Sequence, residues 1–326
     1  SLTHSPHSPH SLTHSQMHLL ITTLFLLHIT PVRLQDILAV DTVLTTYSGS
    51  RTQSGASDGV VSVARFDLPF GIAFNSDRSI AVITDQQACV VRKIHLQRDP
   101  EEVTTLGGIA YECNYTDGVG DGTTRVSVFD SPRGVAYSPD DSYLLVVDQA
   151  GQAVRRYTSS DNTWDTVVTP TGLLRDAYDI AIDRYGSFAL VTDPGSSIII
   201  KFSLEDWSDY SILCGVNNTS GFVNGGFTVN KLFDPRGVVI SRDTSFALFT
   251  DNNSVRRVFI SSGDVATVVG NGVAGYADGN LSSGAMFSQP GGLAFLSSSS
   301  ESSIVVRVCV CVFYVRDCVF WCILYI

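Results

Sequence analysis

The sequence has few of the side chains from which nucleic-acid surfaces and active sites are built. Only 16% of the residues are charged, and 21 Lys and Arg stand against 32 Asp and Glu, which gives a net charge of −11. Phosphate backbones are bound mainly by clustered Lys and Arg, so this composition argues against a nucleic-acid partner. The apolar content of 44% is ample for a core and excludes a disordered polymer.

Residues suited to catalysis are also scarce. Six of the seven His lie within residues 1–28, which leaves His95 alone in the rest of the chain. There are only five Glu, at Glu101, Glu102, Glu112, Glu205 and Glu301. No GxSxG elbow, HExxH motif or nucleotide-binding loop is present. The sequence therefore indicates no catalytic, cofactor-binding or metal-binding residue.

The N-terminal segments differ from the body of the chain. Residues 1–16 are rich in His and Ser and lack apolar periodicity, which predicts a disordered leader. Residues 17–35 contain a mainly apolar run at 19–29, whose length suits the core of a signal peptide and is too short to span a bilayer. We therefore expect a mature chain that begins near Gln35 and reaches the extracellular space or cell surface.

Two further features bear on secretion. Five Asn-x-Ser/Thr sites are candidates for glycosylation: Asn114, Asn217, Asn218, Asn252 and Asn280. The seven Cys contain no CxxC spacing and are odd in number, so neither a zinc cluster nor a closed disulfide framework is indicated. Within the body of the chain, Cys113–Cys214 is a candidate pair.

A repeated segment dominates residues 36–303. It occurs at 66–85, 129–148, 174–193 and 233–251, and a fifth copy begins at 287–300. In three copies a Gly precedes an Asp by 14 residues, and these pairs are Gly71 and Asp85, Gly134 and Asp148, and Gly237 and Asp251. Constant spacing within irregular periods indicates a repeated structural unit.

The third and fifth copies depart from this pattern. In the third, Asp179 replaces the Gly, and Asp193 follows 14 residues later. In the fifth, Gly292 predicts an Asp at position 306, where Val306 is found. If the repeats form a ring, the motif Gly is expected where the innermost strands converge on the central axis. Asp179 is therefore a candidate residue of the channel along that axis.

Each copy has the composition of four short strands. An apolar strand after the Gly is followed by a polar turn, a strand ending in the Asp, a third strand with a basic residue, and a fourth strand. A lead-in at 42–49 resembles a lone fourth strand. Four antiparallel strands per unit, without a helix-period segment, predict an all-β propeller with four full blades and a partial fifth.

The recurring residues have physical roles. Gly allows close approach of backbones near the axis, and Asp is expected to accept hydrogen bonds from the following turn. The Asp-Gly pairs between units, such as Asp58-Gly59 and Asp117-Gly118, lack calcium-loop spacing and are interpreted as tight turns. The paired basic residues of the third strand, for example Arg155-Arg156, raise the alternative of a basic stripe for RNA, which the net charge disfavours.

The chain resembles the NHL-repeat family of β-propellers. The resemblance rests on F-x-x-P-x-G-[IVL], the apolar strand ending in Thr/Val-Asp, the Arg-containing third strand and the segment VVGNGVAGYADG. It covers roughly residues 42–300 and implies a ring of about six blades. Such propellers include binding proteins and enzymes alike, so the resemblance says little about function.

The apolar, Cys-rich tail at 304–326 has three interpretations. It is non-native sequence, a strand that completes an irregular fifth blade, or a membrane anchor. Arg316 and Asp317 interrupt the run near its centre, where charge in a bilayer is expensive, and the β-branched and aromatic composition is typical of strands.

The composition favours a non-catalytic scaffold, secreted or at the cell surface, that binds protein or glycan through one propeller face and needs no cofactor. A first alternative is a propeller hydrolase or lyase that holds a divalent metal, Ca or Zn, in the channel. A second is an intracellular NHL interaction module, which would apply if residues 1–35 are not a targeting segment.

The targeting and glycosylation interpretations are testable together. In a eukaryotic secretory host we expect the intact mass of the secreted chain to correspond to a start near Gln35 and to fall after enzymatic removal of N-linked glycans. The chain made in a bacterial cytoplasm is the unglycosylated reference. A product retained in the cytosol with residues 1–35 intact would contradict the prediction.

Overall fold

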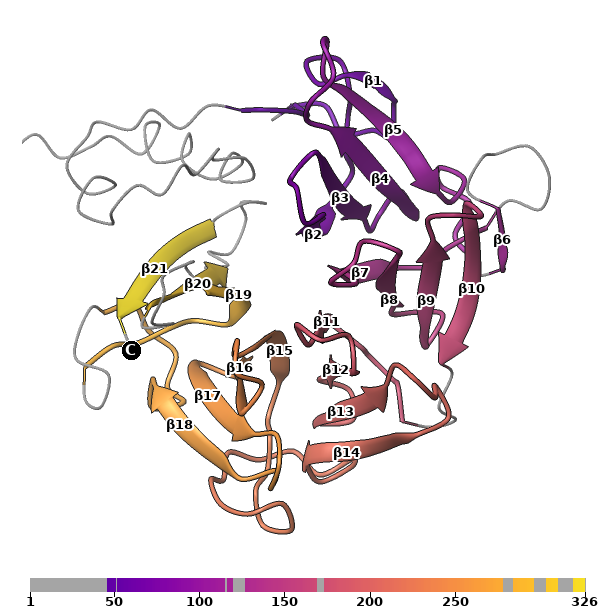
Figure 1. Ribbon diagram of the computed structural model, residues 1–326. Helices are drawn as coiled ribbons and strands as arrows, with labels where there is room; N and C mark the ends of the chain where they lie inside the picture. The colour runs from indigo at the N-terminus through magenta and orange to yellow at the C-terminus, as the bar shows by residue number, and fades with distance from the viewer. Residues whose placement is uncertain are drawn as a thin grey trace, which may run out of the picture.

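The computed structural model describes residues 46–50, 52–114, 116–119, 127–168, 173–277, 284–295, 303–309 and 319–325. Throughout these ranges the regular elements are β-strands, arranged in five antiparallel sheets around a common centre (Figure 1). No helix in the described part of the chain is long and apolar enough to cross a membrane. The leader 1–16, the segment 17–35 and Asn280 lie outside the described residues.

The sheets are blades whose strands run outward from the axis in sequence order. Blade 1 comprises β2 (Pro69–Phe74), β3 (Ile80–Asp85), β4 (Val90–His95) and β5 (Glu102–Gly107), with β1 (Gly59–Val60) on its outer edge. Blade 2 comprises β7 (Pro132–Tyr137), β8 (Tyr143–Asp148), β9 (Ala153–Thr158) and β10 (Thr163–Val168), with β6 (Gly118–Val119) outside. The prediction of four-stranded blades is confirmed.

The remaining blades continue the ring. Blade 3 comprises β11 (Asp179–Ile182), β12 (Phe188–Asp193), β13 (Ile198–Ser203) and β14 (Tyr210–Gly215). Blade 4 comprises β15 (Pro235–Ile240), β16 (Phe246–Asp251), β17 (Ser254–Phe259) and β18 (Val265–Val269). The partial fifth blade has three strands, β19 (Pro290–Phe295), β20 (Ser303–Cys309) and β21 (Val319–Tyr325).

The core lies between the faces of successive blades. For example, Leu145 and Val147 of blade 2 pack against Ile180, Val191 and Ile198 of blade 3. Equivalent clusters lie between the other neighbouring blades, and a further one joins the outer face of blade 1 to residues 47–66. β-Branched residues fill these layers because alternate side chains of each strand point to opposite sheet faces.

The motif Gly is required by close contact between innermost strands. A Cβ at Gly71 would lie 2.5 Å from the carbonyl oxygen of Arg133, and one at Gly237 would lie 2.2 Å from that of Gly291. In blade 1 the Gly belongs to a β-bulge, where Phe70 and Gly71 together oppose Thr84. The predicted role of Gly is therefore correct, and the Pro begins the strand.

A Thr hydroxyl connects each of three blades to the next. The Thr84 hydroxyl accepts a hydrogen bond from the Gly71 N–H and donates to the Arg133 carbonyl of blade 2. The Thr192 and Thr250 hydroxyls donate in the same way to the following blade. In blade 2 this position is Val147, and a backbone hydrogen bond from the Gly134 N–H to the Tyr178 carbonyl connects blade 2 to blade 3 instead.

The expected role of the recurring Asp is wrong in one respect. Its carboxylate mainly accepts hydrogen bonds from the loop that leads into the first strand of its own blade, as in the 2.8 Å bond from the Asp67 N–H to Asp85. Asp148, Asp193 and Asp251 repeat this contact with their entry loops. Only Asp193 also caps the following turn, through the Ser196 N–H. The Asp thus fixes where each blade begins.

A fully buried Arg lies beside this Asp in blades 1, 2 and 4. The pairs are Arg92 with Asp85 at 3.6 Å, Arg155 with Asp148 at 3.7 Å, and Arg256 with Asp251 at 2.5 Å. A charge without water needs several partners. The Arg residues therefore also donate to backbone carbonyls of the link, by which we mean the segment that precedes the first strand of a blade. These carbonyls belong to Ser57 and Arg65 in blade 1, Thr116 and Val128 in blade 2, and Val223 and Lys231 in blade 4.

The same links supply a side chain to each Arg. Asp58 accepts from Arg92 at 2.7 Å and from the Thr105 hydroxyl at 3.0 Å. Asp117 and Asn224 occupy the corresponding positions for the other two Arg residues. We call this arrangement of Arg, Asp and link the arginine clamp. Blade 3 lacks it, because Ile200 stands in the Arg position.

Three details of the repeat differ from the sequence interpretation. In the fourth copy the buried residue three positions before the Pro is Leu232, and Phe233 is 51% exposed. In the fifth copy a turn two residues longer places Val308, and not Val306, opposite Pro290. Within the lead-in, residues 46–49 form no strand and pack against blade 1, and residues 42–45 lie outside the described ranges.

The disulfide pairing also differs. Cys89, in the turn between β3 and β4, is bonded to Cys113 in the following link, and Cys214 is a free, buried thiol. The expected pair Cys113–Cys214 is therefore wrong. Cys214 belongs to the cluster between blades 3 and 4, where it packs as a small apolar residue.

The arginine clamp predicts a contrast between two neighbours on β9. Replacing Arg155 by Ile, the residue found in blade 3, leaves the Asp148 carboxylate buried without its cation and should lower the free energy of unfolding by about 3–5 kcal/mol. Arg156→Ile removes a half-exposed ion pair with Asp165 and should cost about 1 kcal/mol or less. Chemical denaturation of the three proteins measures both, and equal losses would contradict a special role for the clamp.

Candidate functional site

The strongest candidate site is a group of side chains where the innermost strands begin. The residue before the motif Gly is Phe70 in blade 1, Arg133 in blade 2, Tyr178 in blade 3 and Arg236 in blade 4. The innermost strands converge on the axis, which brings these four positions together (Figure 1). We call them the axial cluster.

The axial cluster alternates aromatic rings and guanidinium groups. Arg133 lies 5.5 Å from the ring centre of Phe70 and 5.3 Å from that of Tyr178. Arg236 lies 5.4 Å from the ring centre of Tyr178, and the Phe70 and Tyr178 rings meet edge to face at 4.9 Å. Cation–π contacts of this kind hold long side chains in one arrangement, so four blades present a single preformed surface.

Each Arg of the axial cluster also has a carboxylate partner. Arg133 is 2.9 Å from Asp176, and Arg236 is 2.9 Å from Asp234. Burial opposes the charge of Arg236, but Asp234 and Tyr178 prevail and raise its pKa above the ordinary value. The surface therefore offers aromatic faces, charged donors and carboxylate acceptors with balanced charge.

Asp179, the candidate channel residue, follows the axial cluster directly. One of its oxygens accepts from the Ile180 N–H at 2.9 Å and the other from the Val238 N–H of blade 4 at 3.1 Å. Burial raises the pKa of Asp179 to about 6, even though both hydrogen bonds favour the charged form. Asp179 thus connects blades 3 and 4, at a position where the innermost strand lacks the bulge of its neighbours.

The recurring carboxylates are spread through the blades. Burial raises the pKa of Asp85 to about 7 despite its N–H bond and Arg92, and it raises those of Asp148, Asp193 and Asp251 as well. Within the described ranges, no three His, Cys, Asp or Glu side chains lie close enough to hold a metal ion. The oxygens of Asp58 and Asp117 contact Arg and Thr.

The basic residues of the third strands do not form a continuous stripe. Arg92, Arg155 and Arg256 are fully buried in the arginine clamps. Their neighbours Lys93, Arg156, Lys201 and Arg257 are partly exposed. Burial of three of these seven basic residues interrupts the stripe that the RNA alternative requires.

The glycosylation candidates differ in exposure. Asn114 and Asn218 are exposed, and Asn217 and Asn252 are partly buried. The Asn252 amide nitrogen, to which a glycan would attach, donates to the Gly272 carbonyl at 3.1 Å and is therefore engaged within the fold. Asn114 and Asn218 are therefore the sites that the fold favours.

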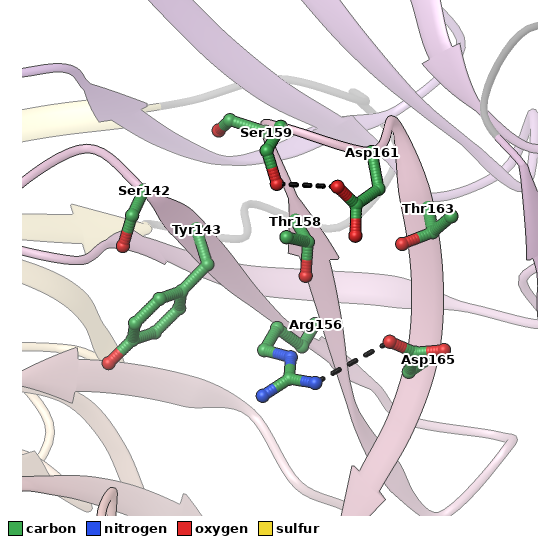
Figure 2. Close-up of a pocket in the computed structure, with 9 residues that line it drawn as sticks. Ser142, Tyr143, Arg156, Thr158, Ser159, Asp161, Thr163 and Asp165 are labelled. Atoms are coloured by element: carbon green, nitrogen blue, oxygen red, sulfur yellow. Dashed lines mark hydrogen bonds and ion pairs between the residues drawn. The ribbon is translucent and has the colours of Figure 1, made fainter.

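A second candidate is a shallow polar hollow on blade 2, with a volume of about 360 Å³. Figure 2 shows its lining of hydroxyl groups from β8, β9 and β10 around Arg156, which points toward Asp165. The Arg156–Asp165 ion pair is 3.5 Å long, and the Ser160 hydroxyl donates to Asp161 at 2.6 Å. The hollow therefore offers hydroxyl groups and one ion pair as hydrogen-bonding partners for a polar ligand.

The sequence pattern alone does not single out the axial cluster. Its residues occupy the variable position of the Pro-x-Gly motif, and a search for repeated residues passes over a position that changes from blade to blade. That variation is nonetheless the available signal, since residues at a constant structural position that differ between blades are free of the repeat's packing requirements.

Comparison with known proteins supports the fold. No family model matches the chain. The chain is similar to the chloroplastic protein SUPPRESSOR OF QUENCHING 1 of Arabidopsis thaliana, with 25% identity over 272 residues covering 76% of this chain and 25% of that protein. It therefore spans about a quarter of the length of this relative.

Two solved structures share the architecture. An auxiliary nutrient binding protein from Bacteroides thetaiotaomicron has a TM-score of 0.51 and 17% identity, over 82% of this chain and 76% of that one. Another from Bacteroides ovatus has a TM-score of 0.50 and 18% identity, over 80% and 73%. At this identity the likeness establishes the class, and the chain is a β-propeller.

Asp179 predicts a specific pH dependence of stability. Its pKa in the folded state is higher than in the unfolded chain, so its contribution to stability is full below pH 4 and is lost as the pH rises through about 6. Relative to Asp179→Asn, the wild-type free energy of unfolding should fall by up to ~3 kcal/mol between pH 4 and pH 7. Denaturation at several pH values measures this difference, in which the other carboxylates cancel, and a constant difference would contradict the prediction.

Proposed function

We propose that the chain is a non-catalytic propeller of the NHL type, secreted or at the cell surface, that binds a protein or glycan through the face carrying the axial cluster. The observation that carries this proposal is the convergence of Phe70, Arg133, Tyr178 and Arg236 from four blades. Rigid aromatic and Arg side chains are the residues that contribute most to binding at protein surfaces. The two Bacteroides proteins of the same fold are nutrient binding proteins, which agrees with a binding role.

The extracellular part of the proposal has separate support. A disulfide joins Cys89 to Cys113, and structural disulfides persist in oxidising compartments and are rare in the cytosol. The exposed positions Asn114 and Asn218 are accessible to the glycosylation machinery. Both features favour the secreted protein over the intracellular NHL module.

The charge of the axial cluster describes the ligand in chemical terms. Because Asp176 and Asp234 balance Arg133 and Arg236, a strongly charged ligand would have to displace an existing ion pair. A neutral polar group, such as a sugar ring or a peptide backbone, uses the donors, the acceptors and the aromatic rings together. Cofactors have no part in this binding.

The proposal predicts the effect of removing the axial side chains. The full chain, screened against immobilised glycans and extracellular proteins, should bind at least one ligand. The double variant Arg133→Ala and Tyr178→Ala should weaken that binding about tenfold or more. Arg98→Ala is the matched control, because Arg98 forms an exposed ion pair with Glu102 on the opposite face.

Two results would overturn the proposal. Equal binding by the double variant and the control would place the ligand elsewhere on the molecule. Turnover of lactones or esters that depends on bound calcium or zinc would establish the hydrolase alternative instead. Circular dichroism verifies that each variant is folded.

A further inference from the structure

The outer edge of blade 3 differs from the outer edges of the other complete blades. In blades 1, 2 and 4 a Gly of the preceding link pairs with a residue of the fourth strand. These pairs are Gly59 with Val103, Gly118 with Trp164, and Gly225 with Val265. The corresponding residue of blade 3 is Tyr210, and no segment of the described chain pairs with it from outside.

The solvent exposure of the four corresponding residues reflects whether a link covers the fourth strand. Val103 and Trp164 are fully buried and Val265 is 3% exposed, but Tyr210 is 40% exposed. In blade 4 both the N–H and the C=O of Val265 bond to Gly225. Since the four positions share one register, the N–H and C=O of Tyr210 point outward in the same way.

The outer edge of blade 3 is unpaired because the link between blades 2 and 3 is short. Five residues separate Val168 of blade 2 from Leu174, whereas sixteen separate Gly215 from Leu232 at the next junction. Five residues extend at most about 18 Å, which is too little to run along a six-residue strand and return. An unpaired edge of this kind is a template for another strand.

We propose that the outer edge of β14 binds an extended segment of a partner protein as an additional antiparallel strand centred on Tyr210. The chain's own links show the form of such a segment, with Asp or Asn followed by Gly in the clamped blades. This binding is separate from the axial cluster and does not depend on it.

The surroundings of the edge determine the chemistry of the bound segment. Where the links place Asp58 against Arg92 and Thr105, blade 3 has Ile200 and Ile212. Ile212 is partly buried and packs in the cluster between blades 2 and 3. The segment therefore carries an apolar residue at the position of the link Asp.

Charge near the edge selects the residues on the C-terminal side of the bound segment. The turn before β14 contains Glu205, Asp206 and Asp209, all exposed. Hydrogen bonds from the Ser208 hydroxyl and N–H lower the pKa of Asp206, which keeps it ionised. An antiparallel segment places the residues after its Gly beside this turn, so basic residues are favoured there.

The register of the edge disfavours a second copy of the chain as the occupant. The end of β14 is already occupied, since the Gly215 N–H donates to the Asn230 side chain at 2.7 Å. A symmetric antiparallel pair through Tyr210–Ile212 would place Ile212 of one copy opposite Tyr210 of the other, where the chain's own links carry a Gly. A second copy therefore lacks the residue that pairs at this position in blades 1, 2 and 4.

The test uses the full chain and a labelled synthetic peptide, Thr-Val-Gly-Val-Lys-Lys. Fluorescence anisotropy should show saturable binding. N-methylation of the peptide Gly, which removes the N–H aimed at the Tyr210 carbonyl, should weaken binding about tenfold. A peptide with Asp in place of the first Val should bind more weakly by a similar factor.

Protein variants locate the site. Tyr210→Pro removes the outward N–H and should reduce affinity about tenfold, while Tyr210→Phe, the matched control, retains it. Circular dichroism and a thermal melt identify any variant that is unfolded. In that case, Ile212→Thr, which copies the Thr of the clamped blades, serves as the second variant and should reduce affinity for the apolar peptide.

Three outcomes would overturn the proposal. They are the absence of saturable binding, equal binding of the methylated and unmethylated peptides, and a dimer in sedimentation that Tyr210→Pro dissociates. The last would identify a second copy as the occupant. Because no axial residue is altered, these results are independent of the ligand of the axial cluster.

Discussion

The structure depends on an arginine that has no access to water. In blades 1, 2 and 4 this side chain connects three segments: its own third strand, the Asp that ends the second strand, and the link that precedes the blade. A guanidinium group has five donors in fixed directions, which suits it to several acceptors at once. Its position therefore determines the path of a Gly-rich link that has little apolar surface to bury.

Blade 3 shows how the parts of this arrangement depend on one another. Where Arg is replaced by Ile200, the Thr of the fourth strand is replaced by Ile212, the link Asp is missing and the outer strand is exposed. The innermost strand of the same blade has Asp179 in place of Gly and lacks the bulge. Blade 3 therefore differs from the other complete blades both at the axis and at the rim.

The sequence predicted the fold because strand alternation and the Gly-to-Asp spacing are local properties repeated many times. It misplaced features that depend on distant neighbours. The pairing of Cys89 with Cys113 requires a turn and a link to meet, and the Asp bonds reach 17 to 18 residues back along the chain. Nothing in a linear pattern distinguishes such a contact from one with the following turn.

The hydroxyl hydrogen bonds between neighbouring blades all run in one direction around the axis, from the second strand of one blade to the innermost strand of the next. The hydroxyls of Thr84, Thr192 and Thr250 each donate a hydrogen bond to the blade that comes next, and the accepting carbonyl belongs to the residue before that blade's motif Gly. A duplicated blade inserted at such a junction would find an acceptor on one side and a donor on the other. Blade number in this architecture is thus open to change by gene duplication or deletion, with no need for new junction chemistry.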